Sequence, residues 1–196
     1  VEPERKMSGK HLSCSGVAIY ATLEKELDLP PHSVALPSSP ASLHASLESG
    51  REPSETMAFV NYYRPGEIHP NEKATLAVLL TAPANGREYG LTDDFVEREI
   101  ERISEQVGFS RPVTEYFGEC EILHPKYFME YGSPGGALYG IVRSLWRSGP
   151  FHRPRYSDRR RPWLWRVGAS VHPGGGIPAV LGGAMISTNR PLKGGI

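Results

Sequence analysis

The sequence feature that most constrains this chain is the segment VGASVHPGGGIPAVL at residues 167–181, close to the C-terminus. Its apolar first residues predict the end of a buried strand, and the glycines and prolines that follow predict a turn. Three consecutive glycines, residues 174–176, give a backbone without Cβ atoms that can lie against a flat ligand. Pro178 suits the first turn of a helix, where its missing N–H costs nothing. The free N–H groups at such a helix start predict a site for negative charge.

The composition is that of an ordinary globular protein. Of the 196 residues, 39% are hydrophobic, which is enough to form a core. The 22 basic and 22 acidic residues cancel, which argues against a dedicated nucleic-acid binder. No apolar run approaches the ~18 residues needed to span a bilayer. Because the sequence starts at Val1 and its first methionine is Met7, we expect it to be a piece of a longer reading frame.

Apolar and β-branched segments predict the strands of a sheet. Residues 74–81 are apolar on both faces, so we expect this strand to lie in the centre of the sheet. Residues 138–146 are also apolar and are compatible with either a strand or a helix. The predicted strands cover residues 15–23, 57–63, 74–81 and 113–122.

Two further segments predict helices. Residues 40–48 place Leu43 and Leu47 four apart, on one face. In residues 92–107 apolar side chains recur at helical spacing, with Thr92 as the expected N-cap and Gly108 as the expected end. The alternating charges of this second helix are expected to form a solvated face.

Strands, one long helix and then further strands predict an α+β fold. Residues 148–162 are rich in proline, arginine and histidine, which is typical of a surface crossing between two bodies. We therefore expect one domain over residues 1–150 and the beginning of a second over residues 151–196.

Candidate catalytic groups are sparse. The sequence shows no Ser/His/Asp arrangement, no paired catalytic carboxylates and no metal-ligand spacing, so no metal site is predicted. Cys14 and Cys120 lack a Cys-x-x-Cys spacing, and we expect two reduced, structural thiols. Glu119 and Glu121 flank Cys120 on a predicted strand, where they share one face and are expected to meet solvent.

The string GASVHPGGGIP at residues 168–178 closely resembles the C-terminal signature of flavin-dependent, phytoene desaturase-type carotenoid oxidoreductases. These enzymes belong to the wider amine-oxidase-like flavoprotein superfamily. Weaker matches occur in the same order as in the family: YGSPGGALYG at residues 131–140 is similar to a glycine-rich segment ending in Tyr-Gly, and FHRP at residues 151–154 is similar to a Phe-x-Arg-Pro motif. The resemblance therefore covers nearly the whole chain.

The resemblance implies a fold for both parts of the chain. By this similarity, residues 1–150 form part of a substrate-binding domain with a mixed sheet and helices. Residues 151–196 would supply the last strand and C-terminal helix of an FAD-binding, Rossmann-like domain. The N-terminal half of that domain, with its Gly-x-Gly-x-x-Gly fingerprint, is missing from this sequence.

The resemblance also implies an activity, namely FAD-dependent desaturation of a carotenoid or similar apolar isoprenoid by hydride transfer to the flavin. It assigns no catalytic residue. A flavin-dependent carotenoid isomerase, a retinol saturase-like enzyme and a lipid-binding fragment without flavin stay open as alternatives. Such enzymes are expected to be cytoplasmic and peripheral to a membrane surface, where their substrate dissolves, and without a nucleic-acid partner.

The cofactor-binding residues that the resemblance implies lie on the glycine-rich loop and the helix start. In the family, the loop passes along the ribityl chain of FAD and the helix start faces the flavin pyrimidine ring. A reduced flavin holds negative charge there, which a helix N-terminus stabilises by ~0.3–1 kcal/mol. His172 is either a hydrogen-bonding group near the cofactor or a structural turn residue. The predicted set is Gly168, Ala169, Ser170, His172, Gly175, Gly176, Ile177, Ala179 and Val180. Among these, Ile177, Ala179 and Val180 are the expected backbone N–H donors.

Aromatic residues of the expected substrate domain have two interpretations, the lining of a substrate tunnel or packing in the core, and core packing is favoured for most. They are Tyr62, Tyr63, Tyr116, Phe117, Tyr127, Phe128, Tyr131 and Tyr139.

Charged residues near the C-terminus depart from the family pattern. Arg166 lies inside the expected last strand at residues 163–167, and Arg190 with Pro191 is expected to end the final helix early. A basic cluster either contacts a phosphate or lipid headgroup or forms a solvated loop. It consists of Arg153, Arg155, Arg159, Arg160 and Arg161.

Overall fold

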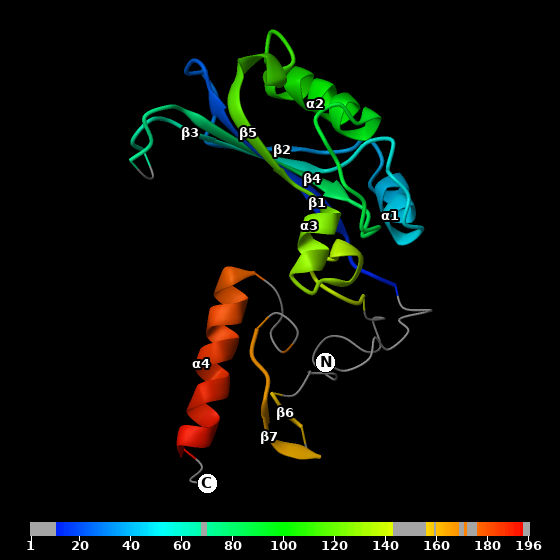
Figure 1. The fold of residues 1–196 in the computed structure, drawn as a ribbon, viewed down its shortest axis with the longest axis vertical. Coiled ribbons are helices and arrows are strands. Elements are labelled where there is room, and N and C mark those ends of the chain that lie inside the picture. The colour runs from blue at the N-terminus through cyan, green and yellow to red at the C-terminus, as the bar shows by residue number, and fades with distance from the viewer. Residues whose placement is uncertain are drawn as a thin grey trace. The chain divides into compact units, whose positions relative to one another are not determined.

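A computed structural model describes residues 11–67, 70–142, 156–158, 160–168, 171 and 176–193 of the chain (Figure 1). The chain forms two compact units. The larger, called the sheet unit here, is Leu12–Leu138, and the smaller, called the terminal unit, comprises Val1–His11 and Tyr139–Ile196. The expected substrate-binding and FAD-binding roles of residues 1–150 and 151–196 stay predictions.

The sheet unit is built on a five-stranded sheet with the order β2-β3-β4-β1-β5. Every neighbouring pair is antiparallel, so the α+β class is confirmed while the prediction of a mixed sheet is wrong. The residue 64–74 connection between β3 and β4 is too short for the crossover that parallel strands need. The central position predicted for residues 74–81 is confirmed, since β4 is the middle strand. The strands are β1 (Ser15–Leu23), β2 (His32–Ala35), β3 (Ala58–Tyr63), β4 (Thr75–Ala82) and β5 (Phe117–Leu123).

One face of this sheet is packed against helix α2 (Asp94–Val107), as Figure 1 shows. Alternate strand residues, such as Ile19 of β1 and Leu80 of β4, point to this face and are fully buried. Phe95 and Ile103 of α2 join them in one hydrophobic cluster. We call this the covered face and the opposite one the outer face.

Helix α2 has its N-cap one residue later than predicted. Its N-cap is Asp93, which has an extended backbone, so the assignment of the cap to Thr92 is wrong. The Asp93 carboxylate accepts hydrogen bonds from the Gly90 amide (2.6 Å) and from Arg87 Nη2 (2.7 Å). Gly108 ends the helix in the left-handed conformation (φ +90°), as predicted.

The expectation that the charges of α2 form only a solvated face is also wrong, because the Glu99 side chain is completely buried. Glu99 Oε2 accepts hydrogen bonds from the Thr56 amide (3.0 Å) and from Arg102 Nε (3.0 Å). Arg102 in turn donates to the carbonyl oxygens of Leu36 (3.2 Å) and Thr56 (2.5 Å). A buried ion pair therefore ties α2 to the segments that follow β2 and precede β3.

The remaining elements of the sheet unit are short. The predicted helix at residues 40–48 is confirmed as α1 (Pro40–Glu48), capped by Ser39, whose hydroxyl accepts from the Ser42 amide. The predicted strand at residues 113–122 is half right, since a 3₁₀ turn, η1 (Val113–Tyr116), precedes β5. The others are α3 (Pro125–Glu130) and the 3₁₀ turn η2 (Pro134–Gly136).

The described part of the terminal unit contains an antiparallel hairpin of β6 (Ser157–Asp158) and β7 (Arg161–Trp165) and the helix α4 (Ile177–Lys193). Arg166 follows β7 and is exposed. The helix continues through Pro191, so the prediction that Arg190 and Pro191 end it is wrong; the fixed φ of proline, about −65°, is itself a helical value. Within the described ranges, no helix has both the length and the apolar character required to cross a membrane.

Candidate functional site

The first candidate site is the start of α4. Gly168 (φ +104°) and Gly176 (φ +92°) both adopt the left-handed region, and no described atom would lie within 4 Å of a Cβ added at either. The Val180 amide donates to the Gly176 carbonyl (2.9 Å), which is the first hydrogen bond of the helix. The Val180 N–H is therefore already used, and those of Ile177 and Ala179 remain as candidate donors.

Ile177 itself is 86% exposed. The other predicted cofactor-binding residues, Ala169, Ser170, His172 and Gly175, lie outside the described residues. So do Arg153, Arg155 and Arg159 of the basic cluster, whereas Arg160 and Arg161 are exposed.

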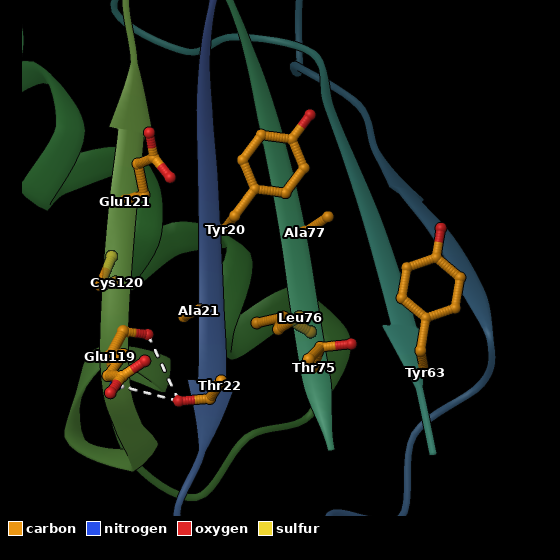
Figure 2. Close-up of a pocket in the computed structure, with 10 residues that line it drawn as sticks. All are labelled: Tyr20, Ala21, Thr22, Tyr63, Thr75, Leu76, Ala77, Glu119, Cys120 and Glu121. Atoms are coloured by element: carbon orange, nitrogen blue, oxygen red, sulfur yellow. Dashed lines mark hydrogen bonds between the residues drawn. The ribbon is translucent and has the colours of Figure 1, made fainter. Parts of the chain in front are cut away.

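The second candidate site is a cavity of about 590 Å³ on the outer face of the sheet (Figure 2). Two tyrosines, Tyr20 and Tyr63, stand on this face on different strands, with the small side chain of Ala77 between them. Of the aromatic residues with a tunnel or core interpretation, Tyr63 lines this cavity. The full lining is Tyr20, Ala21, Thr22, Tyr63, Thr75, Leu76, Ala77, Glu119, Cys120 and Glu121.

Strand register arranges the outer face into three rows that run across the strands. The first, the polar row, contains Tyr63, Thr75, Thr22 and Glu119: Tyr63 pairs with Thr75 and Thr75 with Thr22, while Thr22 is hydrogen-bonded to Glu119. The second, the mixed row, contains His32, Asn61, Ala77, Tyr20 and Glu121. The third, the apolar row, contains Val34, Phe59, Leu79, Ala18 and Leu123.

The two threonines of the polar row differ in their hydrogen bonding. Thr22 Oγ1 accepts from the Glu119 amide (2.9 Å) and donates to the Glu119 carbonyl (3.5 Å), as the dashed lines in Figure 2 show. Thr75 Oγ1 is buried and has no hydrogen-bond partner among the described residues. A buried hydroxyl without a partner is uncommon in folded proteins and calls for an explanation.

The charged groups of the cavity lie on β5. Glu119 and Glu121 are exposed, as predicted, and neither forms an ion pair with any residue that the structure describes. Partial burial raises the pKa of the Cys120 thiol, and burial likewise raises that of Cys14, so both stay protonated and weakly reactive at neutral pH. Both cysteines are free, as expected for reduced thiols.

None of the other aromatic residues with a tunnel or core interpretation lines the cavity, and three of them pack in or against the core. Tyr62 is 1% exposed and belongs to the core, where its hydroxyl accepts from the Leu27 amide. Tyr116 packs against Phe109, with ring centroids 6.4 Å apart. Phe117 packs against the core, Tyr127, Phe128 and Tyr131 contact one another at α3, and Tyr139 is in the terminal unit.

The sequence reasoning missed Tyr20, Thr22 and Thr75 as site residues. A signal was present, because Tyr20 and Thr22 are alternate residues of a strand whose other alternate positions are apolar. Within the described ranges, no group of three or more His, Cys, Asp or Glu side chains is placed to hold a metal ion.

Comparison with characterised proteins gives relatives of one kind. The chain is 27% identical over 200 residues to a 4,4'-diapolycopen-4-al dehydrogenase of Metabacillus indicus, which covers 97% of this chain and 40% of that protein. It is 24% identical over 202 residues to a 4,4'-diapophytoene desaturase of Staphylococcus haemolyticus, covering 96% and 39% respectively. A Staphylococcus aureus desaturase of the same name is 26% identical over 133 residues, covering 64% of this chain and 26% of that protein.

No family model matches the chain. The chain spans about two fifths of the length of the first two relatives. The resemblance deduced from residues 168–178 is nevertheless confirmed, because all three relatives are carotenoid-modifying oxidoreductases. The chain is thus a homologue of the carotenoid desaturases and dehydrogenases over part of their length.

Proposed function

We propose that this chain is the C-terminal portion of an FAD-dependent oxidoreductase that desaturates a carotenoid or a similar apolar isoprenoid. The observation that supports this most strongly is similarity along 96–97% of the chain to a desaturase and a dehydrogenase of carotenoids. The proposal includes association with a membrane surface, where an apolar substrate dissolves.

The residues at the start of α4 fit one edge of a flavin. Gly168 and Gly176 leave open space beside the backbone, and the amides of Ile177 and Ala179 precede the first helical hydrogen bond. These two donors and the helix dipole would stabilise negative charge on a group bound there. Bound FAD would supply the hydride acceptor. In this proposal residues 151–196 complete a flavin domain whose other part lies outside the sequence.

The sheet unit would bind the substrate. Its outer-face cavity offers the faces of Tyr20 and Tyr63 and the methyl group of Ala77 to an apolar chain. Removing hydride from a hydrocarbon chain requires that the chain be oriented and kept from water, because it has no polar group to activate. Holding and orienting the polyene is the role we assign to this surface.

A second candidate activity is the oxidation of a carotenoid aldehyde. The specific observation in its favour is the 27% identity to the 4,4'-diapolycopen-4-al dehydrogenase, which matches 97% of the chain. Both activities need a chain-binding surface, and they differ in whether the reacting end carries oxygen.

The test uses the full-length protein that contains this chain. The purified protein should carry FAD, seen by its visible absorbance, and should convert 4,4'-diapophytoene to products that absorb at longer wavelength. Conversion of the aldehyde to the acid without desaturation would favour the second candidate. Neither FAD nor conversion of either compound would refute both.

A pair of glycine variants tests whether the start of α4 contacts the flavin. Gly176→Val adds a side chain at a left-handed position beside the proposed flavin and should cause loss of FAD from the full-length protein. Gly66→Val is the matched control, because Gly66 also has a positive φ (+69°) and open space but lies in the sheet unit. If Gly176→Val retains FAD, the proposed contact between the start of α4 and the flavin is contradicted.

A further inference from the structure

The cavity on the outer face ends at the mixed row. Among the residues that the structure describes, its lining includes none from the apolar row. Yet the apolar row continues the same face two residues further along the strands, about 7 Å away. Two of its side chains, Val34 and Phe59, are 53% and 37% exposed. An apolar surface therefore lies next to the cavity without belonging to it.

Tyr20 stands at the boundary between the cavity and the apolar row. It lies directly opposite Ala77 in the register of β1 and β4, and Figure 2 shows its ring leaning from β1 over β4 beside Ala77. Tyr20 is half exposed, and its hydroxyl has no hydrogen-bond partner among the described residues. No polar contact within that part of the chain therefore accounts for an aromatic ring at this boundary.

The rest of the mixed row is polar, apart from Ala77. Asn61 is hydrogen-bonded to His32 (2.8 Å), and Glu121 carries a carboxylate. Covering such groups with hydrocarbon removes water from them without replacing its hydrogen bonds, which is costly. An apolar chain that leaves the cavity for the apolar row therefore crosses the mixed row at least cost over Tyr20 and Ala77.

The side chains around the Tyr20 ring leave space at this crossing. Ala77 lies opposite Tyr20, and Ala18 precedes it by two residues on the same face of β1. Leu79, which lies opposite Ala18, reaches over Gly16, where an added Cβ would be 2.8 Å from Leu79 Cδ1. Without the ring, two alanines would form the floor between the cavity and the apolar row.

We propose that Tyr20 determines the length of the isoprenoid chain that the outer face holds, by closing the cavity toward the apolar row. This rests on the proposed function, since it takes the outer face as the isoprenoid-binding surface. A chain bound in the cavity ends against the ring. Without the ring it extends over Ala77 and Ala18, and the added distance of about 7 Å is the extended length of roughly one isoprene unit.

The binding test uses the 196-residue chain and three isoprenoid alcohols of increasing length. These are farnesol (C15), geranylgeraniol (C20) and geranylfarnesol (C25), each supplied in mild detergent. Bound probe is measured by mass spectrometry after gel filtration over a concentration series. The readout is the ratio of C25 affinity to C15 affinity. Because each probe partitions into detergent equally for every variant, differences in this ratio between variants report on the protein alone.

Variants at position 20 test the ring itself. Tyr20→Val removes the ring and keeps a side chain that suits a strand. It should raise the C25-to-C15 ratio about five- to thirtyfold, the range expected for partial burial of one further isoprene unit. Tyr20→Thr is a second variant without the ring and should change the ratio in the same direction. Tyr20→Phe keeps the ring and should leave the ratio within about twofold of that of the unchanged chain.

Two further variants locate the effect at the boundary. Adding Ala77→Leu to Tyr20→Val places a large side chain back at the crossing and should return the ratio to within about threefold of the original. Tyr63→Ala is the matched control, because Tyr63 also lines the cavity but stands in the polar row. It should weaken the binding of all three probes by a similar factor. Urea unfolding checks that each variant is folded.

Several results would overturn the inference: an unchanged ratio in both variants without the ring, a raised ratio in Tyr20→Phe or Tyr63→Ala, no return of the ratio in the double variant, or no binding of any probe to the folded chain. The proposed function is judged separately, by FAD content and polyene conversion in the full-length protein. An unchanged ratio in Tyr20→Val and Tyr20→Thr would remove this inference and leave that proposal standing.

Discussion

The two faces of the five-stranded sheet come from the same strands but differ in nearly every property. On the covered face, side chains such as Val17, Leu76 and Val78 are sealed under α2. On the outer face, Tyr20 is half exposed and a cavity opens beside it. Because successive residues of a strand point to opposite sides, the two faces can serve different purposes. One provides stability, and the other is free to bind.

The largest effect is expected from Glu99, the one charged residue in the described part of α2 that is buried on the covered face. Glu99→Ala should destabilise the sheet unit by about 3–5 kcal/mol, because it leaves Arg102 without its carboxylate and the buried Thr56 amide without an acceptor. Urea unfolding of the chain measures the loss. Glu101→Ala, an exposed neighbour on the same helix, should change stability by less than about 0.5 kcal/mol. Equal effects of the two variants would show that burial of Glu99 contributes nothing.

The next effect compares adjacent residues of β4 that face opposite sides. Leu80→Ala opens a cavity in the core and should cost about 2–5 kcal/mol. Leu79→Ala, the same change on the outer face, should cost less than about 1.5 kcal/mol, because its side chain is only partly buried. The same urea experiment measures both. Similar losses would break the distinction between a covered and an outer face.

The smallest effect is a pH dependence from Tyr89, a buried member of the covered-face cluster. Burial, assisted by the hydrogen bond to Glu52, raises the pKa of Tyr89 to about 12 from its usual 10. A raised pKa means that the folded state favours the neutral phenol. The stability that the buried phenol of Tyr89 contributes is therefore complete below pH 10 and is lost as the pH rises from 10 to 12.

Absorbance of phenolate near 295 nm, followed against pH, measures this titration directly. Subtracting the curve of Tyr89→Phe from that of the unchanged chain should leave a transition close to pH 12. Urea unfolding at pH 9 and pH 11 should show a shallower decline for Tyr89→Phe than for the unchanged chain. A difference curve centred at pH 10 would contradict the burial of this side chain.

Local features of the fold followed from the sequence, whereas features set by distant pairing did not. The bounds of β1 and α1 agree with the predicted ones, because apolar runs, caps and prolines act over a few residues. The antiparallel pairing throughout the sheet was missed, since it depends on which strands become neighbours. Glu99 was misjudged although it stands three residues after Val96 and four before Ile103, on the apolar side of the helix.

The same distinction applies to the candidate sites. The glycine-rich loop and helix start are contiguous, so the resemblance could be recognised from residues 168–178 and is supported by the relatives. The cavity combines residues of four strands, from Tyr20 to Glu121, and only the register brings them together. Composition and motifs contain no information about such a register.

The antiparallel register also determines how this sheet can change during evolution. A substitution on the outer face, such as one at Ala77 or Thr75, would alter the proposed binding surface without touching the core. Inserting or deleting one residue within a strand would exchange its two faces and expose the core side chains beyond that point. Homologues are therefore expected to differ within the strands by replacement and to vary in length in the loops, such as the connection at residues 64–74. New ligand preferences in this sheet would then arise by point substitution alone.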